Sequence, residues 1–368
     1  MQGVSSSMLR SPLVLRLRSF VRMAALLAAA VAPTLAHGQT ADRVLTTEGT
    51  FSGKVVAVSA NDVDVEDRNG EAKKISIDKV REVQFGGEPQ SLRTARSMLA
   101  RGRAAEAIEE LGKIEAEELD GAEQLLLDEL EFVKAGAAGR AALVSGGDPK
   151  APAKVVADFI AKHPKSHHFY EMKELLGDLL ARDGDASGAL AAYSDVGKGP
   201  AALKVRAASA KARMLFDQQK FEDAMKEYDS AIKIDASDDA SAAQKRAAEL
   251  GKARCLSQLG KTDDAVKLVQ GIIKQADPEE KDLLAAAYNV LGAAYRAGDK
   301  DQDALISYLT VDLVYSGSPE SHAEALYNIG ELWDRAKNPE RARDTRKLLE
   351  ESYPASSWAK KLAAAGKG

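Results

Sequence analysis

The most constraining feature of this sequence is a repeated spacing of small residues. Five times along the chain, two glycine or alanine residues stand twelve positions apart within text of helical periodicity. Small residues let the two helices of a helix–turn–helix pair approach closely, and each pair exposes an apolar face that a neighbouring pair must cover. The spacing therefore predicts stacked helical hairpins. The five pairs of small residues are Gly177 and Ala189, Ala212 and Ala224, Ala253 and Ala265, Gly292 and Ala304, and Gly330 and Ala342.

Larger residues complete a motif around these positions. The clearest unit places Leu291 directly before Gly292, and Tyr308 four residues after Ala304. It resembles the tetratricopeptide repeat (TPR), although successive units lie 35 to 41 residues apart, against about 34 in the standard repeat. The resemblance implies a mostly α protein, with a TPR-like α-solenoid over residues 89–368. Arg346 stands where the last unit should carry an aromatic, so we expect loose packing or solvent contact there.

The array should extend beyond the five units. Helical spacing over residues 92–114 predicts one further pair, and residues 121–163 read as a degenerate pair. After Pro354, the segment Ser356–Leu362 is typical of a terminal cap helix. The single cysteine, Cys255, lies among small and apolar residues, which predicts a buried hydrophobe rather than a reactive thiol.

Residues 39–88 have a different pattern. Val63-Asp-Val65 and Lys74-Ile-Ser-Ile77 alternate with a period of two, and Asn69-Gly70 between them is a hairpin turn signal. Four or five short strands of this kind resemble a small SH3-like or Sm-like β-barrel. Because its core would be small, we expect the module to pack on the first helices after Pro89.

The first 38 residues resemble a secretory signal peptide. Four arginines precede the apolar run Met23–Val31, Pro33 ends that run, and small residues follow at Ala36 and Gly38. Cleavage after either small residue would export the chain to the periplasm or cell envelope. The alternative is a retained membrane anchor, which the shortness of the run disfavours. No cysteine stands near the cleavage region, which argues against a lipoprotein.

Composition excludes several function classes. The formal net charge is −5, and removal of the four N-terminal arginines would make it more negative, so we expect no nucleic-acid partner. The sequence contains no phosphate-binding loop, Gly-rich dinucleotide turn, nucleophile elbow or paired zinc-binding cysteines. These observations predict a protein that is not an enzyme and has no cofactor.

The only dense group of imidazoles lies in Lys162-His-Pro-Lys-Ser-His-His168. Three histidines could bind zinc. However, Pro164 separates His163 from His167, so the two cannot share a helical face. We therefore expect a solvated turn between helices here, with metal binding as the alternative.

The TPR resemblance also implies a binding surface. In TPR proteins the first helix of each pair lines a concave groove, and arginine recurs at the corresponding positions of successive units here. Such a basic stripe could receive carboxylates from an extended or helical segment of a partner protein. Alternatively, the arginines pair with acidic residues of adjacent helices. The groove positions are Arg206, Arg213, Arg254, Asn289, Arg296, Asn328, Glu331 and Arg335.

These features favour a protein–protein interaction scaffold of the bacterial periplasm or envelope. The repeat style and the signal resemble exported TPR proteins associated with the Tol-Pal system. Two alternatives remain at this stage: a self-assembling or peptidoglycan-associated structural protein of the envelope, and a metalloenzyme that uses the histidine group.

Overall fold

The computed structural model describes residues 41–145, 147–236, 238–354 and 356–365, which belong to one compact unit. Five strands come first and form one antiparallel sheet in the order β4-β3-β2-β1-β5. The predicted β module is thus present as a sheet. No pairing between the described strands β4 and β5 closes this sheet into a barrel. The strands are β1 (Asp42–Thr46), β2 (Thr50–Val58), β3 (Asp62–Glu66), β4 (Ala72–Ser76) and β5 (Val80–Gln84).

A side chain at the start of β1 joins the two halves of the sheet. The carboxylate of Asp42 accepts hydrogen bonds from the backbone N–H of Val55 in β2, at 2.8 Å, and of Gly86 after β5, at 2.7 Å. The Val55 bond lies at an irregularity in the β2–β3 ladder. The predicted hairpin turn connects β3 to β4, with Gly70 at a φ of 80°. Only glycine adopts that angle without strain.

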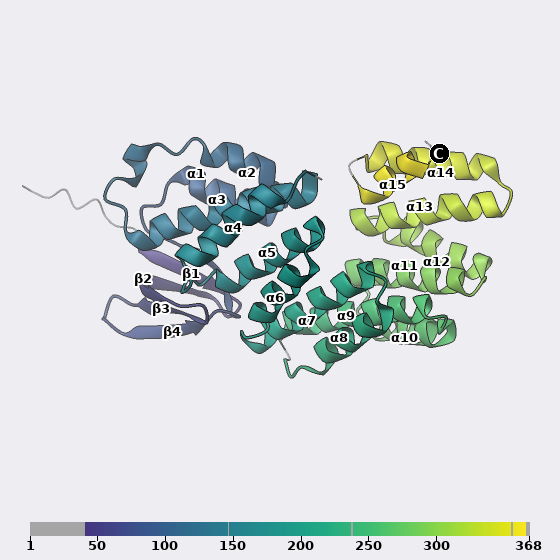
Figure 1. The fold of residues 1–368 in the computed structure, drawn as a ribbon, viewed down its shortest axis with the longest axis horizontal. Helices are drawn as coiled ribbons and strands as arrows, with labels where there is room; N and C mark the ends of the chain where they lie inside the picture. Colours follow the sequence, from purple (N-terminus) through teal and green to yellow (C-terminus); the bar gives the residue numbers. More distant parts are fainter. Residues whose placement is uncertain (1–40, 146, 237, 355, 366–368) are drawn as a thin grey trace, which may run out of the picture. The chain divides into compact units, whose positions relative to one another are not determined.

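The rest of the described chain is helical (Figure 1). Helices follow one another in antiparallel pairs with short connections, as the small-residue spacing predicts. The α-helices are α1 (Gln90–Ala100), α2 (Ala104–Leu111), α3 (Gln124–Ser145), α4 (Lys150–Lys162), α5 (Phe169–Asp183), α6 (Ala186–Val196), α7 (Ala201–Asp217), α8 (Phe221–Lys233), α9 (Asp239–Gln258), α10 (Thr262–Gln275), α11 (Lys281–Ala297), α12 (Asp301–Val314), α13 (Pro319–Arg335), α14 (Pro339–Ser352) and α15 (Ser357–Ala365), and the 3₁₀ helix η1 (Ala116–Leu119) precedes α3.

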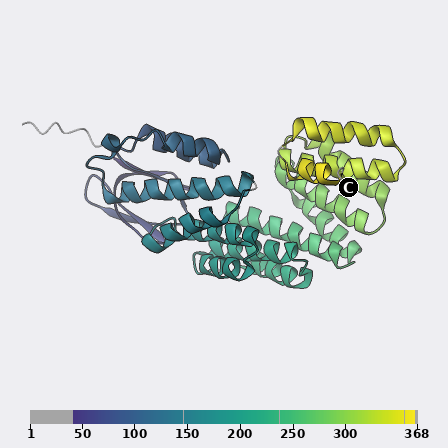
Figure 2. The ribbon, with the colours of Figure 1, turned by 45° about the horizontal axis from the view of Figure 1, so that its top comes forward.

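The helices form two layers. Each odd-numbered helix from α3 to α15 contacts the next odd-numbered helix, and the even-numbered helices pack between successive members of that series. We call the odd-numbered series the inner layer. Figure 2 shows the pairs following one another along the chain in this alternating order. This is the stacking that a TPR-like array requires.

The small residues act as predicted, by removing side-chain volume between paired helices. Within the α11–α12 pair, a Cβ atom on Gly292 would lie 2.8 Å from the ring of Tyr308, which is 1% exposed. The Tyr193 ring contacts Gly177 in the same way. In the last unit the stem of Arg346 takes the aromatic position against Gly330, and its guanidinium pairs with carboxylates of α13. Its side chain is 30% exposed, which agrees with the expected solvent contact.

The sheet and the first helices share one hydrophobic core. Val44, Val63 and Val83 of the sheet belong to the same buried cluster as Leu92 of α1 and Val133 of α3. The module therefore packs on the first helices, as its small size predicts. A further link to the sheet comes from Tyr170 of α5, whose hydroxyl donates a hydrogen bond to Oδ1 of Asn61, directly before β3, at 3.1 Å.

The last described helix and the single cysteine were both singled out by the sequence. Helix α15 packs on α13, with Ala359 buried and the Trp358 ring against Tyr327. Cys255 is fully buried in α9, and burial raises the pKa of its thiol to about 11. At that pKa the thiol stays protonated and unreactive at neutral pH.

The predicted signal segment, residues 1–38, lies outside the described residues. Among the helices that the structure describes, none combines the length and the apolar character needed to cross a bilayer.

The glycine contacts generate a stability prediction. Replacing Gly292 with alanine should lower the free energy of unfolding by about 1–3 kcal/mol, because the new methyl group overlaps the buried Tyr308 ring. Thermal or urea unfolding followed by circular dichroism measures the change. Gly271→Ala in α10 is the matched control, since nothing lies within 4 Å of its Cβ position. That variant should gain up to about 1 kcal/mol from helix propensity. Equal stabilisation of both variants would contradict the packing argument.

Candidate functional site

The eight predicted groove residues all lie on consecutive helices of the inner layer. Arg206 and Arg213 lie on α7, Arg254 on α9, Asn289 and Arg296 on α11, and Asn328, Glu331 and Arg335 on α13. Because α7, α9, α11 and α13 contact one another in turn, these positions form a row across four helices. The structure thus brings them into one region of the array.

Most of the arginines in this row have partners within the protein. Arg206 forms an ion pair with Glu174 of α5. Arg335 pairs with Asp301 of α12, with 3.1 Å between Nε and Oδ2. The longest connection is from Arg254 Nη2 to both carboxylate oxygens of Glu324, at 3.2 and 3.3 Å, which joins α9 to α13 across α11. The charges of the row are therefore partly balanced by neighbouring helices.

Two members of the row are buried between helices. Asn289 is fully buried, and its side-chain N–H₂ donates to the backbone oxygen of Ser321 at 2.8 Å. Asn328 is 8% exposed, donates to the Glu324 backbone oxygen and accepts a hydrogen bond from Arg296 at 2.9 Å. These amides hold α11 against α13. The exposed part of the row is thus formed by its arginines and Glu331.

Arg213 differs from the other arginines. Its side chain is exposed, and no hydrogen bond or ion pair to another described residue is recorded for it. Its charge still acts on its surroundings: burial raises the pKa of Asp217, and Arg213 opposes that rise. Glu174 shows the same balance, since burial raises its pKa against the pull of Arg206. Arg213 is thus the arginine of the row whose guanidinium is not held by another described residue.

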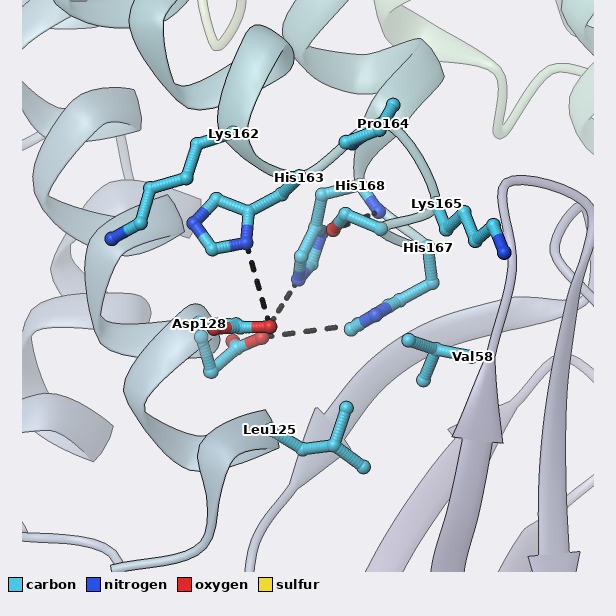
Figure 3. Close-up of a pocket in the computed structure, with 11 residues that line it drawn as sticks. Val58, Leu125, Asp128, Lys162, His163, Pro164, Lys165, His167 and His168 are labelled. Atoms are coloured by element: carbon cyan, nitrogen blue, oxygen red, sulfur yellow. Dashed lines mark hydrogen bonds and ion pairs between the residues drawn. The ribbon is translucent and has the colours of Figure 1, made fainter.

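The histidine segment differs from its prediction. It does connect two helices, α4 and α5, and Lys162, Pro164 and Lys165 are exposed as expected of a turn. Its three histidines are not: their side chains are 9%, 6% and 15% exposed. The prediction of a solvated turn is wrong for these imidazoles because α3 and the end of β2 cover them. Together they enclose a pocket of about 270 Å³, lined among others by Val58, Leu125 and the three imidazoles (Figure 3).

At the centre of this group lies a buried carboxylate. Glu129 of α3 is 2% exposed; its Oε2 lies 2.8 Å from His168 Nε2 and 3.8 Å from His167 Nε2. Its other oxygen, Oε1, faces Arg96 Nε at 3.5 Å. Arg96 in turn pairs with the buried Glu88. A chain of buried charges therefore runs from the end of the sheet through α1 and α3 to the histidines.

The two histidines next to Glu129 have opposite protonation behaviour. Burial lowers the pKa of His167 to about 3, and the neighbouring His168 charge adds to that effect. Burial alone would also lower the pKa of His168, but contacts with Glu129 and Glu171 raise it to about 9. At neutral pH, His167 is thus a neutral imidazole and His168 a cation between two carboxylates.

The sequence does contain a signal for this group. Leu126, Glu129, Leu130 and Val133 follow the spacing of one helix face, and the three apolar members are buried. A carboxylate within such a stripe must find a buried partner, because an unpaired buried charge is very costly. The three nearby imidazoles are the natural candidates, so Glu129 could have been placed with them.

Comparison with known proteins concerns the fold. The sequence matches no family model, and no curated protein matches it. Among solved structures, the apo form of RapI aligns with a TM-score of 0.51 at 13% identity, over 74% of this chain and 79% of that chain. A Rap protein complexed with Competence and Sporulation Factor gives a TM-score of 0.50 at 13% identity, over 74% and 77%. A tetratricopeptide repeat protein from Parabacteroides merdae ATCC 43184 gives 0.48 at 16% identity, over 72% and 94%.

Identities this low report on fold and not on activity. The described chain has the paired helices, the inner layer and the glycine–aromatic contacts of a TPR-like array. The fold predicted from the small-residue spacing is therefore confirmed in its helical part.

The buried charges generate a second stability prediction. Arg96→Leu should destabilise the protein by about 3–5 kcal/mol, because it leaves the carboxylates of Glu88 and Glu129 buried without their shared cation. Equilibrium unfolding in urea measures the loss. Arg103→Leu is the control, since the ion pair of Arg103 with Glu106 is exposed on both sides and should contribute little. Similar stability of the two variants would show that the buried pairs contribute nothing.

Proposed function

We propose that this protein is a non-enzymatic interaction scaffold, exported to the bacterial periplasm or cell envelope, that binds segments of partner proteins along its inner layer. Three observations support the proposal. The fold is a TPR-like array, the N-terminal sequence resembles a secretory signal, and one similar structure is a Rap protein in complex with Competence and Sporulation Factor. Arrays of this kind provide extended binding surfaces rather than enclosed reaction sites.

The observation that carries the proposal is the row of arginines on α7, α9 and α11. Arg213 is exposed and makes no hydrogen bond or ion pair with the part of the chain that the structure describes, and the side chain of Arg254 is 41% exposed although it contacts Glu324. A guanidinium binds a carboxylate through two parallel hydrogen bonds. Acidic side chains of a partner segment could thus bind Arg213 directly and compete with Glu324 for Arg254.

The partner surface can be tested by charge reversal. Arg213→Glu combined with Arg254→Glu should reduce the recovery of bound partners by about tenfold or more, because each carboxylate then repels the acidic side chains that it formerly attracted. Immobilised wild type and variant are incubated with envelope extract of the native cell, and the bound proteins are compared by quantitative mass spectrometry.

The control is a reversal of the same kind on the other layer. Arg343 lies on α14, its side chain is 75% exposed, and its only recorded ion pair among the described residues is with the adjacent Asp344. Arg343→Glu should leave recovery unchanged. If the double variant bound as much partner protein as wild type, with helicity intact by circular dichroism, the arginine row would not be the binding surface.

Export is a separate prediction. In the native bacterium the mature chain should begin at residue 37 or 39, because cleavage is expected after Ala36 or Gly38. Cell fractionation followed by intact mass measurement determines both the compartment and the first residue. An uncleaved chain in the cytoplasmic fraction would contradict export while leaving the binding surface as a scaffold inside the cell.

A further inference from the structure

The group formed by Glu129, His167 and His168 has features that the scaffold function does not use. Their potential ligand atoms all lie within 4.8 Å of one another. Around a tetrahedral zinc ion with bonds of about 2.0–2.2 Å, ligand atoms are separated by about 3.3 Å. The distances from Glu129 Oε2 to His168 Nε2 and His167 Nε2, 2.8 and 3.8 Å, lie on either side of that value. Small side-chain rotations would therefore place all three atoms around one ion.

His167 supplies the second, independent observation. Its side chain is 94% buried, yet its Nε2 atom has no hydrogen-bond partner among the described residues. Buried polar atoms without partners are rare in native proteins because each costs free energy. Figure 3 shows the rings of His167 and His168 turned towards the carboxylates at the base of the pocket. A ligand between them would satisfy the free nitrogen.

The ring of His168 is already held in an orientation suited to metal binding. Its Nδ1 atom faces Glu171 Oε2 at 3.3 Å, and Phe132 stacks on the ring with the planes 3° apart. Metal-binding histidines usually donate their second N–H to a carboxylate in this way, which orients the ring. The Nε2 atom of His168, which now contacts Glu129 at 2.8 Å, would be the nitrogen that binds the ion.

The third histidine of the segment is not part of this set. His163 Nε2 lies 2.8 Å from Glu131, and its Nδ1 lies 3.4 Å from Asp128. Both ring nitrogens thus have carboxylate partners. The set is therefore two imidazoles and one carboxylate, and the adjoining pocket leaves room for water as a fourth ligand.

The chemistry of these ligands selects the class of ion. Imidazole nitrogen suits zinc and its transition-metal neighbours, whereas calcium and magnesium prefer oxygen ligands. The positive charge of Arg96 lies on the other side of Glu129, against Oε1, so the ion would be held by Oε2 alone. The carboxylate of Glu171 adds negative charge beside His168, and that of Asp128 lies in the wall of the pocket, where it contacts His163.

We propose that Glu129, His167 and His168 bind one zinc ion, or a closely similar divalent transition-metal ion, which links α3 to the connection between α4 and α5. Binding replaces the contact between Glu129 and His168 and releases the proton that they share. The ion would hold together the part of the fold where the sheet, the first helices and the solenoid meet.

The test uses the full chain, stripped of metal with a chelator and then dialysed. Titration with ZnCl₂ by calorimetry should show one binding event per chain, and saturation should raise the melting temperature. Titration with CoCl₂ should produce the strong visible absorption of tetrahedral cobalt. Absence of zinc binding up to millimolar concentration would overturn the proposal.

Variants separate the metal site from folding. His167→Leu should lower zinc affinity by about 100-fold or more, yet leave the metal-free protein at least as stable as wild type, because the Nε2 atom of His167 makes no hydrogen bond to any described residue. Glu171→Gln should lower zinc affinity by about 10–100-fold, the usual effect of losing a carboxylate behind a ligand histidine.

His322→Gln is the histidine control. His322 lies on α13, where it contacts Asp312 and Tyr353, far along the chain from the site. This variant should bind zinc as wild type does. Unchanged zinc affinity in His167→Leu would assign the ion to other residues and reject the site.

Discussion

The contact between an aromatic ring and a glycine on a neighbouring helix determines how closely the helices of this array approach. Tyr308 lies against Gly292, and Tyr193 against Gly177. In both pairs the ring occupies the space of the missing side chain, so the helix separation is fixed by the ring. Tyr228 makes the same contact with Gly251, but there the glycine belongs to the next pair. The inner layer, and with it the arginine row, depends on these separations.

The helical part of the fold could be predicted because its determinants are local. Gly177 and Ala189, like Gly292 and Ala304, lie within one hairpin, and their spacing is visible in a single stretch of sequence. The partners of the arginines are not local. Glu324 lies 70 residues from Arg254 in the chain, and nothing in the sequence near either residue indicates the other. Pairing with acidic residues of adjacent helices was one of the two interpretations of the sequence, whereas the particular partners and the burial of the two amides could not be predicted.

The histidine segment also shows that contacts between residues distant in the sequence could not be predicted. Pro164 correctly indicated a break between helices, since proline disrupts a helix locally. Whether the turn meets water depends on what covers it, and the cover comes from Val58, Leu125 and Glu129, far earlier in the chain. Glu129 within an apolar helix face was the one local sign of a buried polar group. The strands of the sheet could be predicted from the alternation of Val63-Asp-Val65 and Lys74-Ile-Ser-Ile77, which is again a local pattern.

The bond from Arg254 to Glu324 has a mechanical consequence. It joins α9 to α13 and passes over α11, so it connects two helix pairs that are not neighbours in the sequence. Asn289, on the helix in between, also points its amide towards the same carboxylate at 3.5 Å. A ligand carboxylate that bound Arg254 would break its bond to Glu324. Ligand binding at α9 would then make α13 less rigidly connected to the array, although the ligand does not touch α13.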